Sequence, residues 1–189
     1  MSFADEVQRA WRRTSKDFVL YIPEVDPDTL TSQWSACLTA IRSSFSAHVG
    51  QTELEQRFSI PEDYATFMCL VGGGWHSSRS LGLWLFSADQ VAGATIEDFR
   101  LFVTGVDENE PPDEPPEDDG LWLRVGRFSD KHDYLICCDR SHSHYGVVLD
   151  GHDSHPWLNG VRFAGCTVLA PSFLAFLKAG CTYVKSNWN

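Results

Sequence analysis

An α+β fold is predicted for this chain of 189 residues from the order of its periodic segments. The early part of the chain carries apolar residues at helical spacing, the later part carries short β runs divided by polar turns, and the last apolar segment is helical again. Helices followed by strands favour α+β over alternating βαβ units. The runs LWLRVGRF, DYLICCD and YGVVLD have the near-regular spacing of an antiparallel meander.

The first 50 residues are predicted to hold two helices with a strand between them. Residues 2–15 have an apolar face that includes Trp11, and residues 17–23 (DFVLYIP) have the composition of a strand. Residues 29–49 form a longer amphipathic pattern, and Gly50 is predicted to end that helix.

A second pair of helices is predicted around FSIPEDYATFMCLVGGGW. The segment TELEQRF is predicted to form one helix. A second helix is predicted to begin at Pro61, with Ser59 as its cap. Its apolar residues recur at i, i+3, i+4 and i+7, which predicts one buried face: Tyr64, Phe67, Met68 and Val71. Gly72 is expected to end this helix in the left-handed conformation. The three glycines follow a helix rather than precede one, so they predict a turn into a strand and not a phosphate-binding loop.

The rest of the chain continues with strands and closes with a helix. LGLWLF and LFVTGV are predicted strands, and SADQVAGATIEDF between them has a helical pattern. WLNGVRFAGCTVLA is predicted to extend the meander, and the final helix begins at Pro171.

Residues 107–120 (DENEPPDEPPEDDG) hold eight acidic residues, four prolines and no basic residue. Such a segment cannot bury a core, so a solvated and partly extended loop is predicted. Two interpretations stay open for this loop. It either only keeps the protein in solution or is an acidic arm that contacts a basic partner.

Composition narrows the function classes. A net charge of −11 disfavours direct binding of DNA or RNA and suits a basic protein partner. No apolar run approaches the roughly 18 residues that span a bilayer, and MSFADEVQRAWRR has no apolar leader, so no membrane contact and a cytoplasmic location are expected. The six cysteines form no CxxC pair and are expected to be free, buried thiols.

Histidines are the strongest candidates for chemistry. The stretch HSHYGVVLDGHDSHP contains four of them: His142, His144, His152 and His155. Together they could bind a metal, but their spacing matches no standard zinc pattern, and histidines exposed in turns are the favoured interpretation. Cys137 or Cys138 with His132 or His142 could form a thiol–imidazole pair, which only geometry can decide. No GxSxG motif occurs. We therefore expect no cofactor, no resident metal and no enzymatic activity.

Tryptophans cluster near the predicted strands: Trp75, Trp84, Trp122 and Trp157. Core packing is the default role of large aromatic residues. Any that are exposed would be anchors for a binding partner.

Four short segments resemble the SUKH superfamily, also called the SMI1/KNR4 domain. LEQRFSIPEDYATFMCLVGGGW resembles the signature helix, turn and helix that end in glycines, and LWLRVGRFSDKHDYLICCD resembles the later strand pair. YGVVLDGHD looks like the family's Gly-x-Val strand with its acidic turn, and PSFLAFL is similar to the closing helix. The segments occur in the family's order over roughly residues 52–178.

The resemblance implies a central sheet flanked by helices and a role in protein binding. It implies an SMI1/KNR4-like domain over residues 51–189, with residues 1–50 as a helical extension packed on it. Bacterial members are typically immunity proteins that bind and neutralise toxins, often nucleases or deaminases, and fungal members are regulatory hubs. We expect an acidic surface to cover the basic active site of a toxin. The expected contacts are Asp107, Glu108, Glu110, Asp113, Glu114, Glu117, Asp118 and Asp119, with Trp84 or Trp122 as an apolar anchor. A regulatory adaptor without a toxin partner, or a small metal-dependent enzyme that uses the four histidines, remains an alternative.

Overall fold

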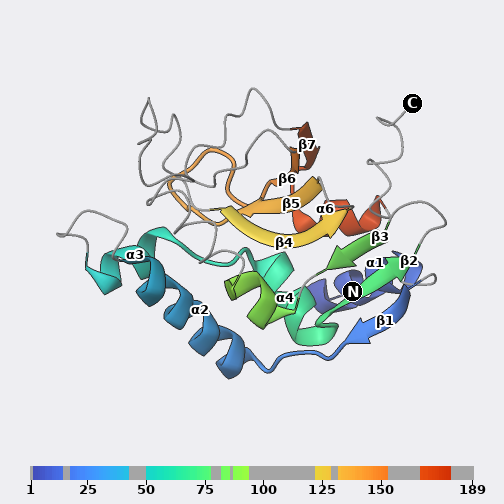
Figure 1. Ribbon diagram of the computed structural model, residues 1–189, viewed down its shortest axis with the longest axis horizontal. Helices are drawn as coiled ribbons and strands as arrows, with labels where there is room; N and C mark the ends of the chain where they lie inside the picture. The colour runs from blue at the N-terminus through green and yellow to red at the C-terminus, as the bar shows by residue number, and fades with distance from the viewer. Residues whose placement is uncertain are drawn as a thin grey trace, which may run out of the picture.

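The computed structural model describes residues 2–14, 18–42, 50–77, 82–85, 87–93, 122–128, 132–152 and 167–179 (Figure 1). Within these ranges seven strands form one sheet, in the order β1-β2-β3-β4-β5-β6-β7. Every pairing between neighbours is antiparallel. Helices accompany this sheet, so the predicted α+β fold with a central antiparallel sheet is confirmed.

The strands follow the predicted runs closely. Their bounds are β1 Phe18–Ile22, β2 Gly73–Ser77, β3 Gly82–Leu85, β4 Trp122–Phe128, β5 His132–Cys137, β6 Val148–His152 and β7 Thr167–Ala170. Each strand pairs with the one that precedes it in sequence order, which is the predicted meander. The predicted strand over residues 101–106 lies outside the described ranges.

The helices are α1 (Phe3–Thr14), α2 (Pro27–Ile41), α3 (Gln51–Arg57), α4 (Glu62–Leu70) and α6 (Phe173–Lys178), and residues 88–93 form a further helical turn. The last helix begins close to the predicted position, because the Ser172 hydroxyl accepts the N–H of Ala175 as a cap.

Helix α2 begins two residues earlier than predicted. The carboxylate of Asp26 caps it by accepting the N–H groups of Asp28 and Thr29, and Pro27 occupies the first turn. The helix ends at Ile41, and residues 43–49 lie outside the described ranges. The prediction that Gly50 ends this helix was wrong, because α2 already ends at Ile41 and Gly50 is the N-cap of α3.

Helix α4 corrects one prediction and confirms another. Pro61 is its N-cap residue and Ser59 makes no cap, because the Ser59 hydroxyl instead bonds to Arg140 and Tyr145. Gly72 follows the helix with a φ of +85°, a region that glycine adopts without strain, and its N–H reaches back to the carbonyl of Phe67. The glycines then lead directly into β2, as predicted.

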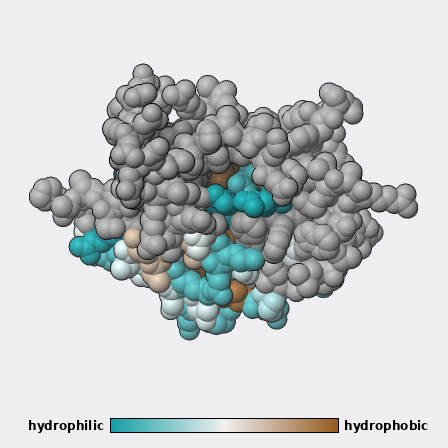
Figure 2. Space-filling model, in the orientation of Figure 1, coloured by the Kyte–Doolittle hydropathy of each residue, from teal (hydrophilic) through white to brown (hydrophobic). Residues whose placement is uncertain are grey.

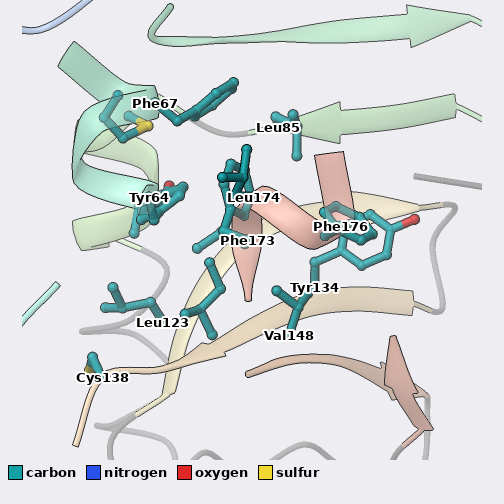
Figure 3. Packing of buried hydrophobic residues seen from close by; sticks show 14 of the residues in the cluster. Tyr64, Phe67, Leu85, Leu123, Tyr134, Cys138, Val148, Phe173, Leu174 and Phe176 are labelled. Atoms are coloured by element: carbon teal, nitrogen blue, oxygen red, sulfur yellow. The ribbon is translucent and has the colours of Figure 1, made fainter. Parts of the chain in front are cut away.

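The main core lies between the helices and one face of the sheet. Figure 3 shows Tyr64 and Phe67 of α4 with Phe173 and Phe176 of α6, between Leu85 and the strand residues Tyr134 and Val148. The ring centroids of Phe67 and Phe173 are 4.9 Å apart, and those of Tyr134 and Phe176 are 5.0 Å apart. Aromatic rings at these distances stabilise the core through preferred ring orientations as well as through the burial of apolar surface. Tyr64, Phe67 and Met68 are buried as the helical spacing predicted.

Part of the opposite face of the sheet is also buried. It carries a smaller cluster of Trp122, Leu135, Cys137 and Leu149. Cys137 and Cys138 are adjacent and fall into different clusters, because successive strand residues point to opposite faces. Burial of both faces explains why β5 reads as a continuous apolar run over YLICC.

The N-terminal helix contributes to the same core. The ring of Trp11 in α1 meets Phe67 edge-on with centroids 5.2 Å apart, and Val7 is completely buried. Glu6 also forms an ion pair with Lys178 of α6. Residues before position 50 therefore share a core with those after it. The predicted domain boundary at residue 50 stays a prediction.

Candidate functional site

The predicted partner contacts lie mainly outside the described ranges. All eight acidic residues belong to segment 107–120, of which the structure describes nothing. The backbone of Trp84 lies in β3, opposite Trp75 and Arg127, while its side chain is not among those described. The acidic contacts and the Trp84 anchor therefore stay predictions.

Trp122 was wrongly predicted as an apolar anchor on the surface. Its side chain is 0% exposed. It packs with Leu135 and Cys137 on the sheet face that α4 and α6 do not cover, and His142 meets its ring edge-on with centroids 5.8 Å apart. The face is buried at this position, so Trp122 fills a core cluster rather than the surface.

Two of the four candidate histidines lie in the turn between β5 and β6. The ring centroids of His142 and His144 are 5.2 Å apart. The N–H of His144 donates to Nδ1 of His142 at 3.1 Å, and Nδ1 of His144 lies 3.0 Å from the Ser143 hydroxyl. Both Nδ1 atoms thus take part in hydrogen bonds that shape the turn itself.

The other two histidines do not complete a site in the described part. His152 ends β6, where its backbone pairs with His132, and His155 lies outside the described ranges. Among the residues that the structure describes, no three histidine, cysteine or acidic side chains converge as metal ligands would. The four-histidine site remains a hypothesis.

The cysteines offer little support for a reactive thiol. Cys37, Cys69, Cys137 and Cys138 are thiols rather than halves of disulfides, and three of them are buried. Burial raises the pKa of Cys37 to about 12 and raises that of Cys138 well above its usual value. Both thiols therefore stay protonated at neutral pH, whereas the nucleophilic form is the thiolate.

A buried ion pair links the end of β5 to the end of α3. Asp139 is 1% exposed, and one of its carboxylate oxygens accepts Nε and Nη2 of Arg57 at 2.9 and 2.7 Å. The other oxygen accepts the N–H and the hydroxyl of Ser141. Burial acts to raise the pKa of Asp139, but the hydrogen bonds and the charge of Arg57 outweigh it and hold the pKa below its usual value.

The segment 58–61 between α3 and α4 is fastened to the same end of the sheet. Phe58 forms a single β-bridge with Asp139, and the N–H of Ser59 donates to the carbonyl of Cys138 at 2.8 Å. The Ser59 hydroxyl accepts Nε of Arg140 at 2.6 Å and lies 2.8 Å from the Tyr145 hydroxyl. This segment is therefore held by both backbone and side-chain bonds.

A groove of about 420 Å³ runs between α2, α3 and segment 58–61. Its lining is mostly apolar, with hydroxyl groups and one carboxylate at the edge: Leu30, Thr31, Trp34, Ser35, Glu55, Phe58, Ser59, Ile60 and Ala65. The hydroxyl of Ser35 donates to Glu55 at 3.2 Å and ties the two helices together across one end. A volume of this size lies within the usual range for clefts that bind ligands or side chains.

A small cavity of about 20 Å³ lies behind the groove. The two spaces share Leu30, Trp34 and Ile60 in their linings. The cavity is otherwise lined mainly by buried apolar residues such as Tyr64 and Leu123. Its volume is close to the minimum for one water molecule, so the cavity is a packing defect rather than a ligand site.

One acidic residue lines the groove, and two more lie one helical turn from lining residues. Glu55 lines it, Asp28 lies on α2 one turn before Thr31, and Glu62 lies in the first turn of α4, three residues before Ala65. All three are exposed. Figure 2 shows a largely hydrophilic surface, with small hydrophobic areas, over the described helices in the lower part of this face. The site can thus offer an apolar floor and a negative rim.

Sequence reasoning did not single out this groove. Trp34 lies on the predicted apolar stripe of α2, but it is half-buried rather than buried. A groove depends on how α2 and α3 meet, which the pattern of either helix alone does not contain. The available signal was a tryptophan on a helix with small polar residues, Thr31 and Ser35, beside it.

Comparison with known proteins adds no relative. No model of a known protein family matches the chain, and no curated protein matches it. Within the described ranges, none of the helices combines the length and the apolar character needed to cross a membrane. The resemblance to the SUKH superfamily rests on the four sequence segments alone.

Proposed function

We propose that this chain is a protein-binding module, and specifically an immunity protein that neutralises a basic bacterial toxin of nuclease or deaminase type. It would act by covering the active site of the toxin rather than by catalysis, and it would work in the cytoplasm. The net charge of −11 supports this proposal, because a nuclease needs a basic surface to hold phosphates and an acidic protein is attracted to that surface.

The packing of the four resembling segments carries the proposal. The first segment, which contains α3 and α4, bonds to the second at the end of β5 through Arg57 and Asp139. It bonds to the last through the carboxylate of Asp63, which accepts the N–H of Leu174 at 2.8 Å. The third segment, which contains β6, pairs with β5. Short motifs scattered over the chain are thus parts of one packed unit, as segments of a shared domain should be.

The proposed mechanism combines steering and exclusion. Long-range attraction between opposite charges raises the rate of encounter, and the bound protein then blocks access to the active site. The acidic segment 107–120 is the proposed contact surface, with Trp84 as the proposed apolar anchor. Trp122 has no part in it, because it is buried in the sheet.

The first experiment is a pull-down from a lysate of the source organism at low and high salt, with the purified chain as bait. A stoichiometric, basic partner that is toxic when expressed alone and harmless together with this chain is the expected result. A bound partner without toxicity would favour the regulatory adaptor. Stoichiometric metal that depends on the four histidines would favour the enzyme.

Charge variants then locate the surface. One variant neutralises four acids of the acidic segment (E108Q, E110Q, D113N and E114Q). Its matched control removes four charges elsewhere (E6Q, E24Q, E53Q and D89N). The first variant should weaken binding about tenfold at low salt and flatten the salt dependence, and the control should do much less. Equal affinities of both variants at low salt would remove the acidic segment from the interface.

A further inference from the structure

We propose that the groove between α2, α3 and segment 58–61 docks a basic segment of the protein partner by accepting one large apolar side chain. This inference rests on the proposed function, in that it names a second surface for the same partner. The groove and the acidic segment 107–120 are separate in sequence, so each can be tested without changing the other.

The chemistry of the floor selects an apolar side chain. Its accessible apolar surface comes from the half-buried side chains of Trp34, Ile60 and Ala65, which lie beside the buried Leu30 and Phe58. Insertion of an apolar side chain into a concave site removes more apolar surface from water than contact with a flat patch, because the side chain is covered on several sides. The gain in binding free energy is correspondingly larger. Tryptophan is also among the residues that contribute most to binding when a partner covers them.

The wall of the groove is already in place before anything binds. Segment 58–61 is held to the sheet by the backbone bonds of Phe58 and Ser59, and α3 is held by the buried pair of Arg57 and Asp139. On the other side, Ser35 joins α2 to Glu55. A site that is ordered in advance has less conformational entropy to lose when the partner binds.

The small cavity gives the floor room to adjust. Trp34 separates the groove from the cavity of about 20 Å³, and Leu30 and Ile60 border both spaces. Well-packed cores resist added volume, whereas a wall backed by a void can shift without clashes. The groove can therefore accept side chains of somewhat different size.

The rim selects a basic segment. Glu55 lines the groove, and the exposed Asp28 and Glu62 each lie one helical turn before a lining residue. None of these three acids has an ion pair among the described residues. Arg140 is the basic residue bonded to the lining, through Ser59, and the charge of Arg57 is balanced by Asp139. The rim is negative on balance. Lysine or arginine on either side of the inserted residue would complement it.

The test follows the indole N–H signal of Trp34 by NMR, assigned by its loss in W34F. The probe is a synthetic 12-residue peptide with leucine on one helical face and lysine on the other. Its matched control has glutamate in place of lysine. The basic peptide should shift the Trp34 signal in a saturable way, and the acidic peptide should leave it unchanged.

Rim variants separate local from general charge effects. D28N, E55Q and E62Q together remove the rim charges while keeping side-chain shape and, for Glu55, its acceptor oxygen. The matched control removes three exposed charges that are not part of the lining, with E24Q, E53Q and D89N. The rim variant should weaken the peptide about fivefold at low ionic strength, and the control less than twofold.

Three outcomes would overturn the inference. These are an unmoved Trp34 signal while other indole signals shift, equal shifts with both peptides, or equal losses in the two charge variants. The proposed function fails separately, if no toxic partner is neutralised, and that failure leaves the peptide result standing. If a toxic partner is neutralised but the peptide neither binds nor competes with it, only the groove is wrong.

Discussion

Asp139 shows how one buried carboxylate can join three parts of the chain. It lies just after β5, receives both nitrogen donors from the end of α3, and closes the following turn through Ser141. Its charge is compensated by a guanidinium that is itself only partly exposed. A buried charge of this kind is costly to leave alone, so its partners are needed together.

The first prediction concerns the stability of D139N as a function of pH. At pH 7 the variant should lose about 1–3 kcal/mol of unfolding free energy, because Arg57 keeps only a neutral acceptor. The folded-state pKa of Asp139 lies below the ordinary value of 3.8, so its stabilisation is present above that value and is lost as pH falls through the folded-state pKa. Urea unfolding of both proteins between pH 2 and 7 measures the difference, which should shrink toward acid.

The exposed residue Glu53 gives the control for this experiment. E53Q should differ from the original chain by less than about 0.5 kcal/mol at every pH. A D139N difference that stays constant from pH 2 to 7 would mean that packing, not charge, makes Asp139 important.

At the scale of elements, Asp63 connects two helices that are distant in sequence. Its carboxylate accepts the N–H of Tyr64 at 2.9 Å within α4 and the N–H of Leu174 at 2.8 Å in the first turn of α6. Helix α6 has only six residues, so much of its order must come from capping and packing. Asp63 and Ser172 supply the caps.

The second prediction is that D63A destabilises the fold by about 1–2 kcal/mol, because the first turn of α6 loses an acceptor that is shielded from water. The neighbouring E62A, which changes an exposed residue, should cost less than about 0.5 kcal/mol. Chemical unfolding compares the two variants. D63N, which keeps one acceptor oxygen, should recover part of the loss, and an equal loss in D63A and E62A would contradict the capping role.

Sequence patterns predicted elements better than they predicted what side chains do. The spacing of Tyr64, Phe67 and Met68 identified a buried helical face, since burial of one face follows directly from the helical period. Serine is a residue type that often caps helices, but the Ser59 hydroxyl bonds to Arg140 instead of a backbone N–H of α4. That arginine approaches Ser59 only in the folded chain. Local patterns carry no information on such partners.

The candidate site was the least predictable part. The acidic segment is visible in composition, but its partner cannot be inferred from charge alone. Trp122 and Trp34 were both visible as tryptophans, yet one is buried in the sheet and the other half-buried at a groove. Exposure depends on which elements cover a position, and that is a property of the tertiary fold.

At the scale of the whole molecule, the helices on both sides of residue 50 share one core. Val7 and Trp11 of α1 and Leu38 of α2 are buried with Phe67 and Phe173. Domains are defined by a core of their own. Removing the first 50 residues would expose the aromatic side chains that α1 covers.

The third prediction is that residues 51–189 do not fold cooperatively without residues 1–50. The shortened chain should bind a hydrophobic dye and show no sharp unfolding transition, because it lacks the part of the core that α1 and α2 supply. W11F in the full chain is the control, since it keeps an aromatic ring and should unfold cooperatively. A shortened chain with dispersed NMR signals and a sharp transition would instead support the predicted boundary.

The meander order of the sheet also has a consequence for biosynthesis. Each strand pairs with the strand made just before it, so the sheet can be extended step by step as the chain leaves the ribosome. The core cannot be completed in the same way, because α1 and α4, made early, pack against α6, made near the end of the chain. Until α6 emerges, the rings of Phe67 and Tyr64 lack the covering that Phe173 provides, and a nascent chain stalled before residue 173 would present part of them to chaperones.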